Sequence, residues 1–107
     1  MTTPRIRAMW ERLPSDWMPV EDGASLLKEL KREMPWGHQL RGKDLTVFAR
    51  ADYHDDIALV LPDGSIAEVH LTWNKERDPA WPYVSGPMSF ADWLKFREED
   101  REFREHA

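Results

Sequence analysis

The stretch Asp55-Asp56-Ile57-Ala58-Leu59-Val60-Leu61-Pro62-Asp63-Gly64-Ser65-Ile66-Ala67-Glu68-Val69-His70-Leu71-Thr72-Trp73 decides the fold. It contains two apolar runs that are separated by Pro62-Asp63-Gly64. Proline fixes φ at the first corner of a turn, aspartate bonds to its own backbone, and glycine accepts the left-handed conformation that closes the turn. The pattern therefore predicts a β-hairpin.

A third strand is predicted just before this hairpin. Side chains alternate over residues 45–51, with Leu45, Val47, Ala49 and Ala51 on one face and Thr46, Phe48 and Arg50 on the other. The connection that follows is short, and short connections favour antiparallel neighbours. We therefore expect a three-stranded antiparallel meander with strands over about 45–51, 56–61 and 66–73.

Three segments have the spacing and end signals of helices. Thr3 and Pro4 begin a short helix that ends before Pro14. Apolar residues recur with helical spacing over 23–34, where Asp22 is the expected N-cap and the charges of 28–33 are expected to face solvent. Ser89 is expected to cap a third helix over 90–104. The prolines and glycine of residues 74–87 predict a long loop.

These elements predict a single α+β domain over residues 1–107. Its core would be the three-stranded antiparallel meander, with two or three helices packed mainly on one face. Residues 1–21 are expected to wrap over the domain, and 97–107 to form a charged helix end. Because an exposed three-stranded sheet has two free edges, a homodimer is also expected.

Composition excludes several classes of function. The chain has no cysteine, which rules out disulfides, thiol catalysis and Cys-ligated zinc. Its net charge of −5 argues against nucleic acid as a partner. No apolar run approaches the length of a membrane span, and the first residues lack the apolar core of a secretory signal. We therefore expect a cytoplasmic protein with no cofactor and no membrane partner.

A resemblance is carried by the strand Val69-His70-Leu71-Thr72-Trp73. The rest of its pattern is Asp55-Asp56 before an apolar strand, Asp63-Gly64, Trp81-Pro82, Ser89-Phe90 and Trp93. With these residues, the chain resembles a group of small bacterial proteins over roughly residues 36–96. The resemblance implies a bacterial source and membership of that group. It implies no activity, cofactor or catalytic residue.

A first candidate site lies on the polar side of the hairpin. Alternation places Glu68, His70 and Thr72 on one face of the last predicted strand. If Asp55 and Asp56 fold toward that face, a histidine with carboxylates would form a divalent-metal or acid–base site. The alternative is that Glu68 and His70 face solvent and that both aspartates form turns. Since no metal-binding motif is present, the alternative is favoured and no metal ligands are assigned.

A second candidate site is aromatic, because the chain contains six tryptophans. Trp73, Trp81 and Tyr83 flank or lie within the long loop, where exposed rings would bind a peptide, a partner helix or a small ligand. The alternative, which we favour, is that these rings belong to the core of a small domain. Even so, one or two of the six tryptophans are expected to be exposed.

Three functions follow from these patterns. The favoured one is a protein-binding module of the immunity or antitoxin kind, whose acidity would suit a basic toxin or nuclease. The second is a small metal- or ligand-dependent enzyme that uses His70, Glu68, Asp55 and Asp56. The third is a structural subunit of a homo-oligomer.

Overall fold

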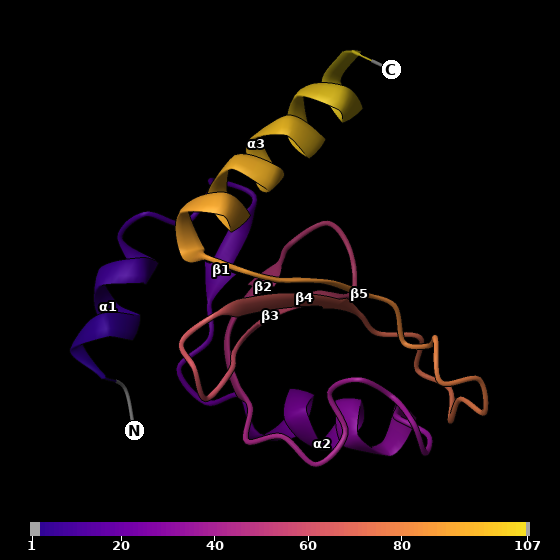
Figure 1. The fold of residues 1–107 in the computed structure, drawn as a ribbon. Helices are drawn as coiled ribbons and strands as arrows, with labels where there is room; N and C mark the ends of the chain where they lie inside the picture. The colour runs from indigo at the N-terminus through magenta and orange to yellow at the C-terminus, as the bar shows by residue number, and fades with distance from the viewer. Residues whose placement is uncertain (1–2, 107) are drawn as a thin grey trace.

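A five-stranded antiparallel sheet forms the middle layer of the protein, which a computed structural model describes over residues 3–106 (Figure 1). The elements in chain order are α1 (Pro4–Trp10), β1 (Trp17–Pro19), α2 (Ala24–Glu33), β2 (Thr46–Ala51), β3 (Asp56–Val60), β4 (Ile66–His70), β5 (Val84–Met88) and α3 (Phe90–His106). The strands lie in the sheet in the order of the sequence. The α+β class and the antiparallel meander are confirmed, but the sheet has five strands rather than three.

The predicted hairpin is formed by β3 and β4. Ile57 lies opposite Val69 and Leu59 opposite Ala67. In the turn, Gly64 has a φ of 86°, and the Asp63 carboxylate accepts a 2.9 Å hydrogen bond from the Ser65 backbone N–H. The turn chemistry inferred from Pro62-Asp63-Gly64 is therefore present, and it determines which residues of the two strands face one another.

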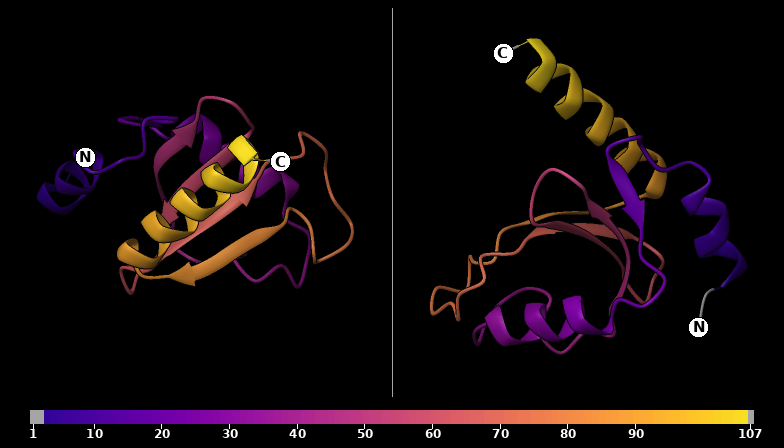
Figure 2. Two further views of the ribbon diagram at one scale, coloured as in Figure 1. Left: turned by 90° about the horizontal axis from the view of Figure 1, so that it is seen from above. Right: turned by 180° about the vertical axis from the view of Figure 1, so that it is seen from behind.

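Helices cover both faces of the sheet, so the prediction that they pack mainly on one face is wrong. Figures 1 and 2 show α2 below the sheet and α3 above it. The α2 layer contains the buried residues Leu30, Met34, Leu40, Leu45, Val47, Ile57, Leu59, Leu61, Ala67, Val69 and Leu71. The opposite layer contains Ile6, Met9, Trp17, Phe48, Ala49, Ala51, Ala58, Ile66 and Trp93. Two separate cores are formed because the hairpin strands are apolar on both sides.

A β-bulge divides β2 between these two cores. Val47 pairs with Leu59 and Ala49 with Ala58, so Phe48 is an additional residue on β2. The sequence placed Val47 and Ala49 on the same face of the strand. After the bulge the alternation is shifted by one residue, so Ala49 lies with Phe48 in the α3 layer while Val47 lies in the α2 layer. The Phe48 carbonyl accepts hydrogen bonds from the Val20 N–H at 2.9 Å and from the Trp10 indole N–H at 2.7 Å. The bulge thus joins the N-terminal segment to the sheet.

The two strands that the sequence did not predict lie at the edges of the sheet. β1 belongs to the segment expected only to wrap over the domain, and β5 belongs to the predicted loop 74–87. Each contains a proline, Pro19 in β1 and Pro87 in β5, and a proline on an edge strand hinders pairing with another chain. The homodimer stays a prediction, but open sheet edges no longer support it.

The helix ends largely follow the sequence signals. Thr3 accepts a hydrogen bond from the Ile6 N–H, and Ser89 accepts one from the Asp92 N–H. The N-cap of α2 is Gly23 rather than Asp22, whose carboxylate accepts from the Ala24 N–H. α3 extends beyond the sheet (Figure 2). Among the described residues, no helix has the length and apolar character needed to cross a membrane.

We predict that Trp93→Ala lowers the free energy of unfolding by about 3–5 kcal/mol, because it leaves a large cavity beneath α3. Trp93 is fully buried and packs edge-on against Trp17, with ring centroids 5.1 Å apart. The matched control is Trp36→Ala, since Trp36 is 83% exposed. It should change the free energy of unfolding by less than about 1 kcal/mol. Urea denaturation followed by circular dichroism measures both, and equal losses would contradict the assignment.

Candidate functional site

The structure brings together His70 and Asp56, two of the four residues of the predicted polar site. They lie opposite each other at the ends of β4 and β3. His70 Nδ1 is 2.6 Å from Asp56 Oδ1, and about half of the His70 side chain is exposed. Because the Asp56 carboxylate binds Nδ1, Nε2 is the ring nitrogen that remains for another partner. Asp55 has a backbone role, since its carbonyl accepts the Leu71 N–H at 2.8 Å.

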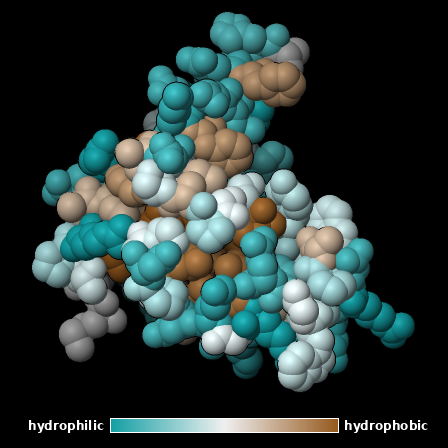
Figure 3. All heavy atoms as spheres, in the orientation of Figure 1, coloured by the Kyte–Doolittle hydropathy of each residue, from teal (hydrophilic) through white to brown (hydrophobic). Residues whose placement is uncertain are grey.

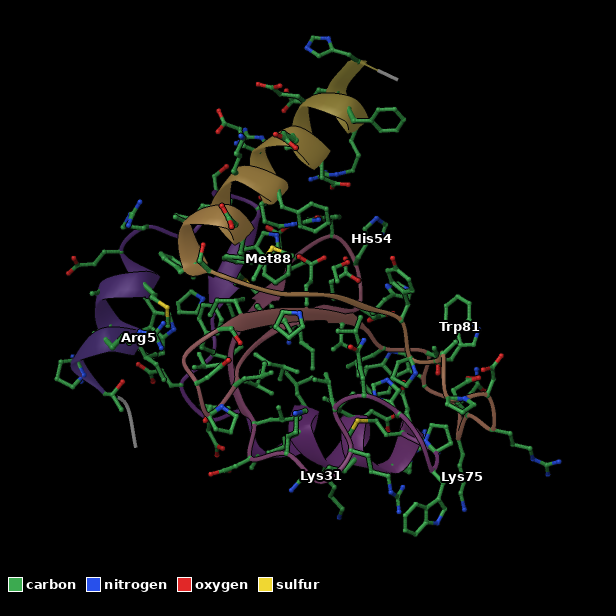
Figure 4. All side chains as sticks on the ribbon, in the orientation of Figure 1. Arg5, Lys31, His54, Lys75, Trp81 and Met88 are labelled. Carbon is green, nitrogen blue, oxygen red and sulfur yellow. The ribbon has the colours of Figure 1, made fainter. Side chains whose placement is uncertain are left out.

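A hollow of about 340 Å³ adjoins this pair and is lined by Arg50, Ala51, Asp52, Tyr53, His54, Asp55 and His70. The His54 and His70 ring centroids are 6.4 Å apart, and Figure 4 shows His54 on the α3 side of the sheet. An imidazole held by a carboxylate can accept a proton. Within residues 3–106, however, no group of three or more His, Asp or Glu side chains could hold a metal. The lining also contains no serine or threonine hydroxyl to serve as a nucleophile.

Glu68 lies in the interior, so its predicted place beside His70 on a solvent-facing surface is wrong. Its side chain is covered by α3, and the residue is 7% exposed. The Trp93 indole N–H donates to Glu68 Oε1 at 3.0 Å. Arg97 Nε lies 2.9 Å from the same oxygen, in an ion pair whose N–H is not aligned as a hydrogen bond. Burial raises the pKa of Glu68 to about 7, although Arg97 and the Trp93 hydrogen bond act in the opposite direction.

The same ion pair belongs to a network that holds α3 against the sheet. Arg97 donates to the Tyr53 hydroxyl at 2.8 Å. Arg104, two turns further along, pairs with Asp16 at 2.9 Å and with Asp100 at 2.8 Å. Glu68 is therefore part of the interface between α3 and β4, where its role is structural.

Three of the six tryptophans are exposed, whereas the sequence led us to expect one or two. The exposed fractions are 83% for Trp36, 51% for Trp73 and 44% for Trp81, and Tyr83 is 57% exposed. The core interpretation of Trp73, Trp81 and Tyr83 is therefore wrong. All four rings lie on the loops 34–42 and 71–83, which meet at the end of the molecule opposite α1 (Figure 1). Trp81 and Tyr83 are neighbours, whereas Trp36 lies under Arg41 and Trp73 borders a separate hollow with Leu26 and His54. We call the end of the molecule that carries Trp36, Trp73, Trp81 and Tyr83 the aromatic end.

Glu33, the last residue of α2, holds the second of these loops. Its buried carboxylate accepts backbone N–H bonds from Thr72 at 2.8 Å and from Trp73 at 2.9 Å. Its carbonyl accepts a third, from Glu76 at 3.2 Å. These bonds hold Trp73 at a φ of 60°, a left-handed conformation that tryptophan rarely adopts. Burial raises the pKa of Glu33. The sequence placed this residue among solvent-facing charges.

His38 joins the two loops to each other. It is 5% exposed, and its Nδ1 accepts a 3.1 Å hydrogen bond from the Leu40 N–H. Nε2 must then carry the proton, and it donates to the Pro82 carbonyl at 2.8 Å. Pro82 lies between Trp81 and Tyr83, whose ring centroids are 6.3 Å apart. The sequence showed His38 only as a loop residue.

No family model, curated protein or solved structure matches this chain. The resemblance carried by His70-Leu71-Thr72-Trp73 stays a sequence-based expectation. The aromatic end and the His70–Asp56 pair are therefore the two features of the structure that point to a function.

We predict that Glu33→Gln loosens the loop after β4. The amide can replace only one of the two acceptor oxygens, so a partly buried N–H of Thr72 or Trp73 loses its partner, at a cost of about 1 kcal/mol. Hydrogen exchange should show faster exchange at these two amides, while amides of β3 keep their protection. The exposed Glu98→Gln serves as the control. Unchanged exchange at Thr72 and Trp73 would contradict the assigned role.

We also predict that stability falls as the pH rises from about 5 to about 7.5. Glu68 keeps its proton in the folded state up to a pKa of about 7, whereas the unfolded chain loses it near 4.5. The folded state therefore binds more protons in this range, and the free energy of unfolding decreases by at most about 3 kcal/mol. The raised pKa of Glu33 acts in the same direction.

Glu68→Gln tests this assignment, because glutamine does not titrate in this range. Urea denaturation at a series of pH values should show a flatter profile for this variant than for the wild type. A wild-type profile that rises with pH would contradict the prediction, as would an unchanged profile in Glu68→Gln.

Proposed function

We propose that the protein is a protein-binding module and that the aromatic end is its contact surface. The observation that carries this proposal is the exposure of four large aromatic side chains on two loops held by Glu33 and His38. Tryptophan and tyrosine dominate binding energies because each buries a large rigid surface and offers a polar group. Figure 4 shows Trp81 extending from its loop away from the body of the molecule.

Energetics support a binding role for these rings. Burying a large apolar side chain contributes about 1.5–3 kcal/mol, and the chain obtains this from Trp17 and Trp93. The rings of the aromatic end give up much of that contribution in the isolated chain, and a partner that covered them would restore it. Because the polar contacts of Glu33 and His38 already order the loops, binding would cost less conformational entropy than at mobile loops.

Fewer observations support the hypothesis that the protein is an enzyme. It rests on the short His70–Asp56 contact and the adjacent hollow, since Glu68 is taken up by Arg97 and Trp93. The aromatic end instead exposes four large aromatic side chains on loops that Glu33 and His38 hold. The homo-oligomer hypothesis is a special case of the favoured one, in which a second copy covers the same rings.

We expect Trp81→Ala/Tyr83→Ala to abolish partner binding while leaving the fold intact. Immobilised wild-type protein should retain at least one protein from the lysate of its native host, and this variant should retain about tenfold less of it. The control is Met18→Ala/Phe103→Ala, which removes two exposed apolar side chains outside the aromatic end. Calorimetry with the purified captured protein then measures direct binding. If no captured protein distinguishes the variant from the control, the proposal fails.

A further inference from the structure

Positive charge gathers around the aromatic end although the chain as a whole carries −5. Residues 28–43 contain five lysines and arginines against two glutamates. Loop 71–83 adds Lys75 and Arg77 together with Glu76 and Asp78, so the excess of positive charge comes from residues 28–43. Figure 4 shows Lys31 extending from α2 away from the sheet, and Lys75 on the loop at the same end of the molecule as Trp81. The local charge therefore differs in sign from the net charge.

Of these cations, Arg32 pairs with Glu29 at 2.8 Å, but the others form no ion pair in the described part of the chain. Among the described residues, no carboxylate forms an ion pair with Lys31, Arg41, Lys43, Lys75 or Arg77. The nearby carboxylates are bound locally instead. Glu33 is buried on Thr72 and Trp73, Glu76 accepts from the Thr72 hydroxyl at 3.0 Å, and Asp78 accepts from the Ala80 N–H. The positive charges therefore stay available to a ligand.

A hollow of about 390 Å³ lies among these cations and is lined by Lys31, Met34, Arg41, Gly42 and Lys43. The Arg41 guanidinium donates to the Met34 carbonyl at 2.8 Å and lies over the Trp36 ring, 4.9 Å from its centroid. Arg41 is thus held in place between the hollow and the aromatic end. A carboxylate of a ligand could pair with the cations of this hollow. An apolar side chain next to that carboxylate could then pack against the exposed Trp36 ring.

We propose that the aromatic end binds an acidic segment of a partner protein, whose carboxylates pair with Lys31, Arg41 and Lys43 and whose apolar side chains cover the tryptophans. This inference rests on the proposed function and names the chemistry of the partner. It reverses the expectation of a basic toxin or nuclease, which came from the net charge. Figure 3 shows the free end of α3, which is largely hydrophilic, at the top of the molecule. It lies on the other side of the sheet from α2 and takes no part in the proposed binding surface.

Single-stranded nucleic acid also binds surfaces that combine cations with aromatic rings. A phosphate chain carries a charge at every nucleotide, so it would bring charges against Asp44, Glu76 and Asp78 as well as against the cations. A peptide carries charge only where its sequence places it, so it can leave uncharged polar residues opposite those carboxylates. The peptide is therefore favoured, and an oligonucleotide serves as a competing probe.

The test is a titration of the ¹⁵N-labelled protein with three probes of equal length. They are a synthetic peptide of about twelve residues that alternates glutamate pairs with phenylalanine or leucine, its counterpart with lysine in place of glutamate, and a deoxythymidine oligonucleotide. The glutamate peptide should shift the indole N–H signals of Trp36, Trp73 and Trp81, and its affinity should fall as salt is added. Tighter binding of either other probe, or no binding of the glutamate peptide, would overturn the proposal.

Lys31→Glu/Lys43→Glu should weaken binding of the glutamate peptide on the order of tenfold. The matched control is Arg7→Glu/Lys95→Glu, which changes the net charge equally on exposed faces of α1 and α3. It should weaken binding much less, and equal effects would overturn the assignment to the hollow. If Trp81→Ala/Tyr83→Ala abolishes capture but the glutamate peptide does not bind, the proposed function stands and only the acidic partner is wrong.

Discussion

The structure depends on a central hairpin that is apolar on both faces. Ile57 and Val69 face the α2 core, while Ala58 and Ile66 face the α3 core. A sheet of this kind is stable only when each face is covered, so the chain must supply a helical layer to both sides. The Phe48 bulge allows β2 to serve both layers.

Covering both faces also decides which polar groups reach the surface. α3 covers Glu68, whose carboxylate is bound by Arg97 and Trp93. His70 lies two residues further along β4, where α3 no longer covers the strand and about half of the side chain is exposed. The two residues share a face of the strand in the sequence pattern, yet their surroundings are opposite. On this strand, the exposure of a polar side chain therefore depends on whether α3 covers it.

The four rings of the aromatic end lie outside both core layers and are exposed. Its loops are anchored by Met34, Leu40 and Leu71 in the α2 core, and the carboxylate of Glu33 and the imidazole of His38 add polar contacts. Hydrogen bonds of this kind fix the backbone and leave the large side chains free for a partner. The cations around them give this end a charge opposite to that of the whole chain.

The sequence by itself determined the features that depend on neighbouring residues. These are the Pro62-Asp63-Gly64 turn, the hairpin it joins and the helix starts at Thr3 and Ser89, because each is set by local backbone preference and short-range hydrogen bonds. Only the tertiary structure decided the edge strands, the bulge, the burial of Glu68 and the roles of Glu33 and His38. The Glu33 carboxylate binds residues 39 and 40 positions away, and His38 binds one 44 positions away. No local pattern encodes such contacts, since they arise only when packing brings distant backbone groups beside a buried side chain.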